Sequence, residues 1–296
     1  MKEVPIPRVT REPPLHLVFE TDSTQNIAKK FLKTHSFSPE EKISCEGFVA
    51  LRQTQGRGRQ GRVWEQESQS DFFDQLFLSF AVNFNLQFPT AFKRELLPLA
   101  FGFCVYEFLF LKEGFERAPQ KGQVFLKWPN DLVYEENIED KNFKKFGGIL
   151  VEGLGGNSQF VLGLGLNLRK SPIHLQNISC SLDDIAWKVN ANATMPFLPP
   201  ALGLAAGLQN KFLSFLEGWM ASPESVQKKL MENLWTRAMG PLHGRTAKLQ
   251  VGSGPASDTN QKFGMIQGLA PDGALEIWNP SLNKIQRAHA GDVTIV

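Results

Sequence analysis

The feature that most constrains the fold is a short tract rich in glycine and arginine, from Gly56 to Arg62. Glycine is poorly suited to the interior of a helix or strand, so the tract predicts a loop. Arginine keeps its charge at neutral pH, and its planar fork suits phosphate oxygens. Apolar segments that predict strands lie before and after it, at Phe48–Arg52 and Leu76–Val82. We therefore expect a phosphate-handling loop between two strands.

A second motif combines charged and amide side chains at a turn. Lys127, Asn130 and Asp131 belong to the run Lys-Trp-Pro-Asn-Asp. Expected strands enter and leave this run, at Val124–Trp128 and Leu132–Glu135, and its proline and asparagine favour a turn. A lysine, an amide and a carboxylate are therefore expected close together.

Lys145 adds a cation that leads into an apolar segment. The charged stretch Glu136–Lys144 predicts a surface excursion, and long apolar strands are expected after it, at Gly148–Gly153 and Gln159–Leu168. Together with the glycine–arginine loop, these residues favour chemistry on an acyl carboxylate and a nucleotide.

The rest of the chain predicts further helices and a terminal β unit. Asp22, Ser23 and Thr24 are capping residue types ahead of a helix. The segment Lys170–Pro200 is polar and marked by prolines. The other expected elements are a strand at Leu15–Glu20, helices at Arg94–Lys112, Ala201–Phe215 and Ser225–Met239, and short strands at Thr246–Val251, Phe263–Leu269, Ala274–Trp278 and Lys284–His289.

Composition limits the broad class of protein. A chain of 296 residues that is 42% hydrophobic can fill one large core and a smaller one. Its 32 basic and 30 acidic residues give a net charge of only +2, which argues against general attachment to nucleic acid or to an anionic membrane. The longest apolar stretch, Leu96–Leu111, is shorter than the roughly 20 residues of a membrane span.

Cysteine and histidine usage indicates neither a disulfide framework nor a zinc site. Cys45, Cys104 and Cys180 are three in number and form no C-x-x-C pair. The five histidines show no metal-ligand spacing, and we expect no catalytic role for them. The first residues carry no signal-peptide core, so a reducing cytoplasm is the expected compartment.

Five motifs in order resemble the biotin protein ligases, which adenylate biotin and attach it to a lysine of a carboxylase carrier domain. These motifs are Asp22–Thr24, Gln53 with Gly56–Trp64, Lys127–Asp131, Lys145–Glu152 and Gly163–Asn167. The resemblance implies an α+β fold, with a class II synthetase-like mixed sheet, flanking helices and a small C-terminal SH3-like β-barrel. It implies an N-terminal tail at 1–14, a catalytic domain at 15–240 and the SH3-like domain at 241–296. About twenty residues precede the Ser-Thr pair, too few for the DNA-binding domain of some members.

The resemblance also implies the site residues, and two positions close to them in the sequence depart from the family. The biotin-binding residues are expected to be Ser23, Thr24, Gln53, Gly56, Arg57, Lys145 and Gly148. The ATP-binding residues are expected to be Arg57, Arg59, Arg62, Trp64, Lys127, Asn130 and Asn167. The expected catalytic residues are Lys145, Arg59 and Asp131, with Asp131 either binding Mg²⁺ or acting as a base. Gln25 stands where the family usually has asparagine, and Gln60 where it is often basic.

The expected function is that of a biotin protein ligase with ATP, Mg²⁺ and biotin as ligands. The partner implied is the biotin carboxyl carrier domain of acetyl-CoA carboxylase or a related carboxylase, and pairing of exposed strands is a route to a homodimer. A lipoate or other fatty-acyl ligase of the same superfamily is the nearest alternative. A non-catalytic nucleic-acid or biotin-sensing module that uses the basic loop is the other.

Overall fold

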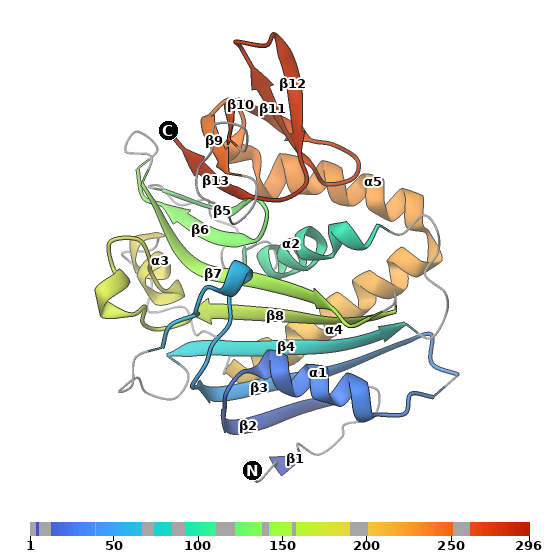
Figure 1. Ribbon diagram of the computed structural model, residues 1–296. Coiled ribbons are helices and arrows are strands. Elements are labelled where there is room, and N and C mark those ends of the chain that lie inside the picture. The colour runs from blue at the N-terminus through green and yellow to red at the C-terminus, as the bar shows by residue number, and fades with distance from the viewer. Residues whose placement is uncertain are drawn as a thin grey trace.

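A computed structural model describes residues 4–5, 13–38, 40–66, 74–84, 93–110, 122–137, 142–155, 158–189, 201–250 and 261–296 (Figure 1). The larger part of it is an eight-stranded sheet with the order β1-β2-β3-β4-β8-β7-β6-β5. β2 and β3 are parallel, and the other neighbours are antiparallel, so the expected mixed sheet is confirmed. Its strands are β1 (Val4–Pro5), β2 (Leu15–Thr21), β3 (Ile43–Gln53), β4 (Gln75–Phe84), β5 (Gln123–Lys127), β6 (Asp131–Glu135), β7 (Phe143–Gly153) and β8 (Gln159–Asn167).

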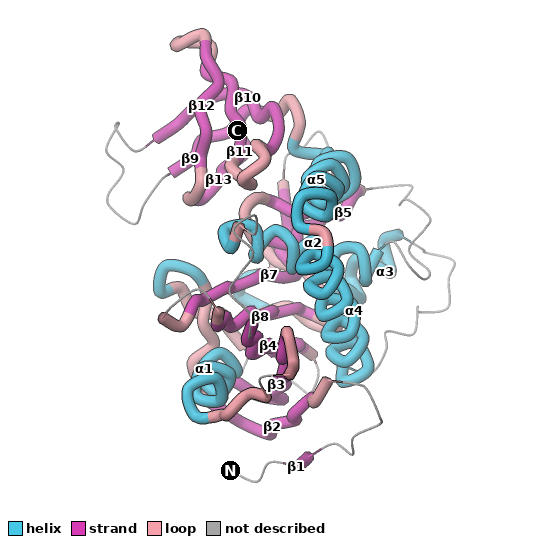
Figure 2. Tube along the Cα trace, turned by 90° about the vertical axis from the view of Figure 1, so that its right-hand side faces the viewer, coloured by secondary structure: helices cyan, strands magenta, loops and turns pink. Residues whose placement is uncertain are grey.

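Helices cover both faces of this sheet (Figure 2). α1 (Thr24–Thr34) packs against β3, β4 and β8 on one face. On the other face, α2 (Leu97–Phe110) contacts β7, and α4 (Ala201–Ala221) contacts β3, β4 and α2. The remaining helices are α3 (Leu182–Val189) and α5 (Pro223–Asn233), and α5 packs on α4.

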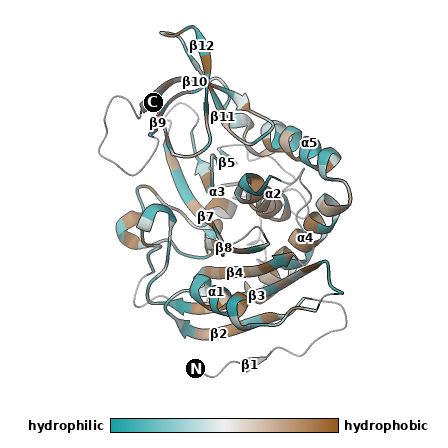
Figure 3. Ribbon diagram, turned by 45° about the vertical axis from the view of Figure 1, so that its right-hand side comes forward, coloured by the Kyte–Doolittle hydropathy of each residue, from teal (hydrophilic) through white to brown (hydrophobic). Residues whose placement is uncertain are grey.

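The main core lies between the sheet and the α2–α4 layer. Alternation along β4 directs Leu76 and Phe80 into this core, whereas Ala81 packs in a smaller cluster beneath α1. α2 is almost entirely buried, and its rings pack on those of α4, as in the pair Phe101–Phe212 at 4.9 Å between centroids. Figure 3 shows much of α2 as hydrophobic, while α5 on the outer side carries many hydrophilic residues.

A separate five-stranded antiparallel sheet forms the C-terminal part, as expected for the SH3-like unit. Its order is β12-β11-β10-β9-β13. The strands are β9 (Thr246–Gln250), β10 (Gln261–Leu269), β11 (Leu275–Asn279), β12 (Lys284–Ala288) and β13 (Asp292–Ile295).

Side chains of the main sheet make polar contacts with the C-terminal part of the chain. The indole nitrogen of the buried Trp128 donates a hydrogen bond to the carbonyl oxygen of Gly273 at 3.1 Å. Arg245, next to β9, meets both carboxylate oxygens of the fully buried Glu135 on β6, at 2.7 and 2.8 Å. The Lys-Trp-Pro-Asn-Asp turn is therefore held directly by the C-terminal part of the chain.

Several expected elements differ from the structure. α3 lies inside the segment 170–200 that was expected to be only polar, because Leu182 and Ile185 are one helical turn apart and both buried. β7 begins at Phe143, so Lys145 lies within a strand rather than ahead of one. The helix expected at Ser225–Met239 ends at Asn233 and continues as a π-helical turn, Leu234–Ala238. β13 was not expected, and the end of the helix expected at Arg94–Lys112 lies outside the described residues.

Candidate functional site

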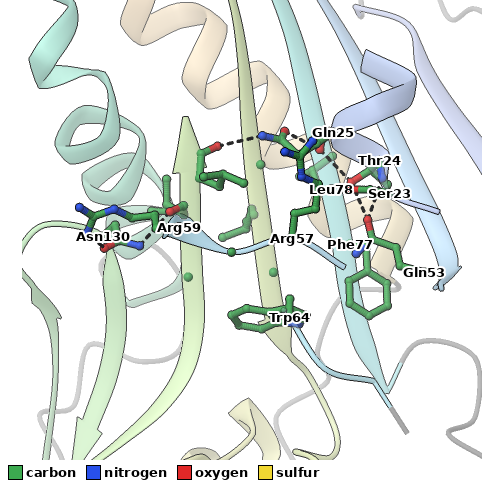
Figure 4. Close-up of a pocket in the computed structure, with 18 of the residues that line it drawn as sticks. Ser23, Thr24, Gln25, Gln53, Arg57, Arg59, Trp64, Phe77, Leu78 and Asn130 are labelled. Atoms are coloured by element: carbon green, nitrogen blue, oxygen red, sulfur yellow. Dashed lines mark hydrogen bonds between the residues drawn. The ribbon is translucent and has the colours of Figure 1, made fainter. Parts of the chain in front are cut away.

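The candidate site lies on the α1 face of the main sheet, at the N-terminal end of that helix (Figure 4). The sheet presents small and polar residues there: Ser79 from β4, and Gly163 and Gly165 from β8. Their neighbours Leu162 and Leu166 point into the main core. From the sequence alone, Gly163 and Gly165 could simply be glycines within a strand. In the structure they form the floor of a cavity.

A β-bulge in β7 allows two nearby residues to line this cavity. The register between β6 and β7 shifts between Leu132 and Val133, which leaves Phe146 as an extra residue on β7. Phe146 is fully buried in the core. Lys145 before it and Gly148 after it both line the cavity.

Trp64 lies directly on the glycine floor. A Cβ atom on Gly165 would lie 2.7 Å from Cε2 of the indole, and one on Gly148 would lie 3.0 Å from Cζ3. Larger residues at these positions would push the ring away. The ammonium group of Lys145 lies 5.3 Å from the ring centroid, a cation–π distance.

Polar side chains from α1 and β3 form one end of the cavity. The backbone N–H of Thr24 donates to Oε1 of Gln53 at 2.7 Å, which orients the Gln53 amide. Ser23 is buried at the N-cap position, yet its hydroxyl group does not cap the helix, so the expected capping role is wrong for Ser23. Ser23, Thr24 and Gln53, for which the resemblance implies biotin binding, all line the cavity.

The glycine–arginine loop closes on itself before it crosses the site. Gly58 N–H donates to the carbonyl of Arg62 at 2.7 Å, and Trp64 N–H donates to the carbonyl of Gly56 at 3.0 Å. A Cβ atom on Gly56 would lie 2.3 Å from the Trp64 carbonyl oxygen, so only glycine allows this contact. Gly56 thus shapes the loop and does not itself line the cavity.

Each arginine of the loop has a partner within the protein. Arg57 donates to Oδ1 of Asn26 at 3.0 Å, and Arg59 donates to Oδ1 of Asn130 at 2.8 Å. Figure 4 shows Arg59 and Asn130 at the end of the site opposite Thr24 and Gln53. Arg62 instead pairs with Asp292 of the C-terminal sheet, outside the cavity.

The expected catalytic residues are grouped around Lys145. Its ammonium group lies 2.7 Å from Oδ1 of Asp131. The backbone of Lys145 is held separately, because its N–H donates a hydrogen bond to the Ile178 carbonyl at 2.9 Å. Lys127 pairs with Asp131 in the β5–β6 ladder. Burial lowers the pKa of the Lys127 ammonium group, while the Asp131 carboxylate opposes this shift. Neither Lys127 nor Asp131 lines the cavity.

A second cavity lies on the other side of Lys145. Lys145 and Trp64 line both cavities, and Gln75 and Asn167 line only this one. Gln75 donates to Oδ1 of Asn167 at 2.8 Å, and Asn167 donates to the Cys180 carbonyl at 3.0 Å. Nε1 of Trp64 and Oε1 of Gln75 are buried and have no hydrogen-bond partner in the described part of the chain. A donor and an acceptor without partners in the described part of the chain therefore belong to side chains that line this cavity.

Sequence reasoning missed three residues that complete the first cavity or support it. Gln25 and Ser79 line it, and Glu152 accepts a hydrogen bond from Gln25 at 2.9 Å. The signal for Gln25 was its departure from the family pattern, and Glu152 closes the Lys145–Glu152 motif. For Ser79 the signal was a hydroxyl-bearing residue in the middle of the expected apolar strand Leu76–Val82.

The described residues do not form a metal site from protein ligands alone. No group of three or more His, Cys, Asp or Glu side chains among them could hold a metal ion. Asp131, the expected Mg²⁺ ligand, has its carboxylate against the Lys145 ammonium group. The donor set therefore does not fit a metal held only by protein. In the same described part of the chain, no helix is both long and apolar enough to cross a membrane.

Comparison with known proteins places the chain in a family. The sequence model of the biotin/lipoate A/B protein ligase family matches residues 20–168, and the chain belongs to this family. This range contains every expected site residue.

Solved structures of biotin protein ligases share the fold. The Aquifex aeolicus biotin protein ligase in complex with biotin and ATP is 24% identical, with a TM-score of 0.65 over 95% of this chain and 97% of that one. The Leishmania major biotin protein ligase in complex with biotinyl-5-AMP is 20% identical, with a TM-score of 0.56 over 95% of this chain and 98% of that one. The match includes the C-terminal sheet as well as the main sheet, because it covers nearly the whole chain.

Proposed function

We propose that this chain is a biotin protein ligase, which joins biotin to AMP and then transfers biotin to a lysine of a carrier domain. The observation that carries the proposal is the layout of the first cavity. Hydrogen-bonding groups of Ser23, Thr24 and Gln53 lie at one end, and Arg59 and Lys145 bring positive charge to the rest. Biotin is a bicyclic urea with a carboxylate tail, so its polar ring matches the hydrogen-bonding end of the cavity and its anionic tail matches the positively charged part. The biotin-bound relatives support the assignment.

The first step needs cations rather than a base. A carboxylic acid with a pKa near 4–5 is already ionised at neutral pH, so the carboxylate can attack the α-phosphorus of ATP directly. Two like charges about 4 Å apart repel by roughly 4 kcal/mol at an effective dielectric of about 20. Lys145, Arg57 and Arg59 line the cavity and can offset this repulsion. Pyrophosphate leaves with the electron pair of the broken P–O bond.

The second cavity suits the base of the nucleotide. Trp64 separates it from the first cavity, so an acyl-adenylate could span both cavities with its phosphate at Lys145. Nε1 of Trp64 and Oε1 of Gln75 are buried and unpaired, and a shift of these side chains on nucleotide binding would present a donor and an acceptor to the edge of a purine. On this proposal Asn167 orients Gln75 and does not need to touch the base itself.

The second step requires a neutral lysine on the acceptor. A lysine with a reference pKa near 10.4 is mostly protonated at pH 7, so a group at the site must accept its proton. Asp131 is the carboxylate in contact with Lys145, at 2.7 Å, and this contact orients it beside the site. We assign Asp131 this role of base ahead of metal binding. The acceptor would be a biotin carboxyl carrier domain.

Magnesium would be brought by the nucleotide under this proposal. Mg²⁺ is commonly held by one or two carboxylates together with substrate phosphates, and it would supply further positive charge to those phosphates. The described residues contain no group of three or more side chains that could hold the ion, so the steps above depend on Lys145 and the arginines.

The alternatives fit the site less well. The dithiolane ring of lipoate carries neither N–H nor C=O groups, so it would leave Ser23, Thr24 and Gln53 without ligand hydrogen bonds. A nucleic-acid module would need unpaired cations spread over an open surface. Arg57 and Arg59 instead line a cavity and hydrogen-bond within the protein.

The test is exchange of labelled pyrophosphate into ATP. Purified protein with ATP and Mg²⁺ should catalyse exchange that depends on biotin, with octanoate and lipoate as comparison acids. Exchange with lipoate or octanoate but not with biotin would assign the chain to the other branch of the family. A folded protein that exchanges with none of them, yet binds oligonucleotides in a salt-dependent way, would favour the nucleic-acid module.

A further inference from the structure

A chain of buried hydrogen bonds runs from the cavity wall to a charged side chain behind it. Thr24 Oγ1 lies 2.8 Å from Ser79 Oγ, and Ser79 Oγ lies 3.0 Å from Oε1 of Gln25. Nε2 of Gln25 donates to Oε2 of Glu152 at 2.9 Å. Thr24, Gln25 and Ser79 are at most 3% exposed, so water cannot substitute for a missing bond within this chain.

The Glu152 carboxylate fixes which way the Gln25 amide points. A carboxylate only accepts hydrogen bonds, so the NH2 group of Gln25 must face it and the carbonyl oxygen must face Ser79. The Leu150 carbonyl, 3.4 Å from the same nitrogen, favours the same orientation. Lys29 holds the other carboxylate oxygen at 2.7 Å.

The number of hydroxyl protons then determines which group donates in each hydrogen bond of this series. The two hydroxyl groups have one proton each, but there are three contacts to fill, because Thr24 Oγ1 also lies 3.1 Å from Gln53 Oε1. The Gln25 carbonyl oxygen takes the Ser79 proton. The Thr24 hydroxyl group then has two possible acceptors, and we assign its proton to Ser79 Oγ at 2.8 Å, which is nearer than Gln53 Oε1 at 3.1 Å. Gln53 Oε1 keeps the Thr24 backbone N–H as its donor. The Thr24 oxygen is left with free lone pairs on the side of the cavity.

We propose that Glu152 and Gln25 are positioning residues that make the Thr24 hydroxyl group an acceptor toward the cavity, so that the site selects acids whose ring carries an N–H donor. This inference rests on the proposed function and deepens it, because it locates the preference for a urea-like ring behind the cavity wall. Gly163 contributes, since a Cβ atom there would lie 2.9 Å from the Gln25 carbonyl oxygen and displace it.

The test compares E152Q with K29M in binding and in kinetics. In E152Q, Lys29 should bind the carbonyl oxygen of the new glutamine, so that its NH2 group faces Gln25. The Gln25 amide should then rotate by about 180°, with its carbonyl oxygen toward position 152 and its NH2 group toward Ser79. Each hydrogen bond from Gln25 to Thr24 would then run in the opposite direction. The Kd for biotin by calorimetry should rise about tenfold, equivalent to about 1.4 kcal/mol. The Kd for octanoate, which has no N–H, should change less than about twofold. KM for biotin in exchange should rise with kcat unchanged.

Two matched variants separate this role from general damage. K29M also breaks an ion pair of Glu152 but keeps the carboxylate, so biotin binding should change less than about twofold. S79A should weaken biotin binding like E152Q, and the double variant should bind no more weakly than S79A, because Glu152 acts through Ser79. Equal loss for biotin and octanoate, or additive losses in the double variant, would overturn the inference. If the unmodified protein fails to bind biotin, the proposed function fails with it.

Discussion

The ion pair between Arg245 and Glu135 should be the charged contact whose loss costs most stability. Glu135 is fully buried, and Arg245 meets both of its oxygens, while Gln123 donates a third bond at 2.7 Å. R245M keeps much of the aliphatic packing against Phe125 and Phe143 but leaves the carboxylate with one neutral donor. Breaking a buried pair in this way costs about 3–5 kcal/mol.

Thermal and urea unfolding, followed by circular dichroism, would measure this cost. At about 2 °C for each kcal/mol in a chain of this size, R245M should lower Tm by roughly 6–10 °C. R287M is the matched control, because Arg287 pairs with Glu276 at 2.9 Å on the surface, where such pairs contribute about 0–1 kcal/mol.

A second change tests the reason for the cost. Adding E135Q to R245M removes the unpaired buried charge, so the double variant should be more stable than R245M alone. The reasoning would be refuted if R245M were no less stable than R287M, or if E135Q made R245M worse.

Three further predictions concern the site and the core. K145A should lower kcat for biotin-dependent exchange about 10³-fold, since one cation near 4 Å contributes about 4 kcal/mol. The Kd for biotin by calorimetry should rise less than tenfold, and equal effects on kcat and Kd would reject the role of Lys145 in offsetting charge during the reaction. G165A should push Trp64 off the sheet and raise the Kd for ATP about tenfold or more, read by tryptophan fluorescence, whereas G218A, with open space at its Cβ position, should change nothing. Burial raises the pKa of the Cys45 thiol to about 12, so iodoacetamide at pH 8 should label Cys45 only after unfolding, and rapid labelling of native protein would contradict this.

Local patterns predicted the main sheet because its strands alternate clearly. β4 and β8 carry large apolar residues on one face and, apart from Phe77, smaller or polar residues on the other, and this period of two is visible without any structure. α3 could not be recognised in the same way. It is short, follows a proline-marked stretch, and is held by tertiary contacts of Leu182 and Ile185 rather than by a long amphipathic pattern.

Motifs located the site, but not the partners of its side chains. The bulge at Phe146 changes which residues of β7 share a face, and it follows from strand register, which a sequence does not display. For the same reason the contact of Lys145 with Asp131, and the separation of Arg62 from the other arginines, could not be foreseen.

The nearest partners of Arg57 and Arg59 are neutral, unlike the Asp292 partner of Arg62, and this difference bears on how the site attracts an anion. The partner of Arg59 is the amide of Asn130, and the nearest partner of Arg57 is the amide of Asn26, with Glu152 farther away at 3.6 Å. An amide oxygen orients a guanidinium group without cancelling its charge, whereas a carboxylate would cancel it. The structure therefore holds these arginines in place and leaves most of their positive potential directed at the cavity. A ligand phosphate can then meet cations that are already oriented, at a smaller cost in side-chain entropy than free arginines would require.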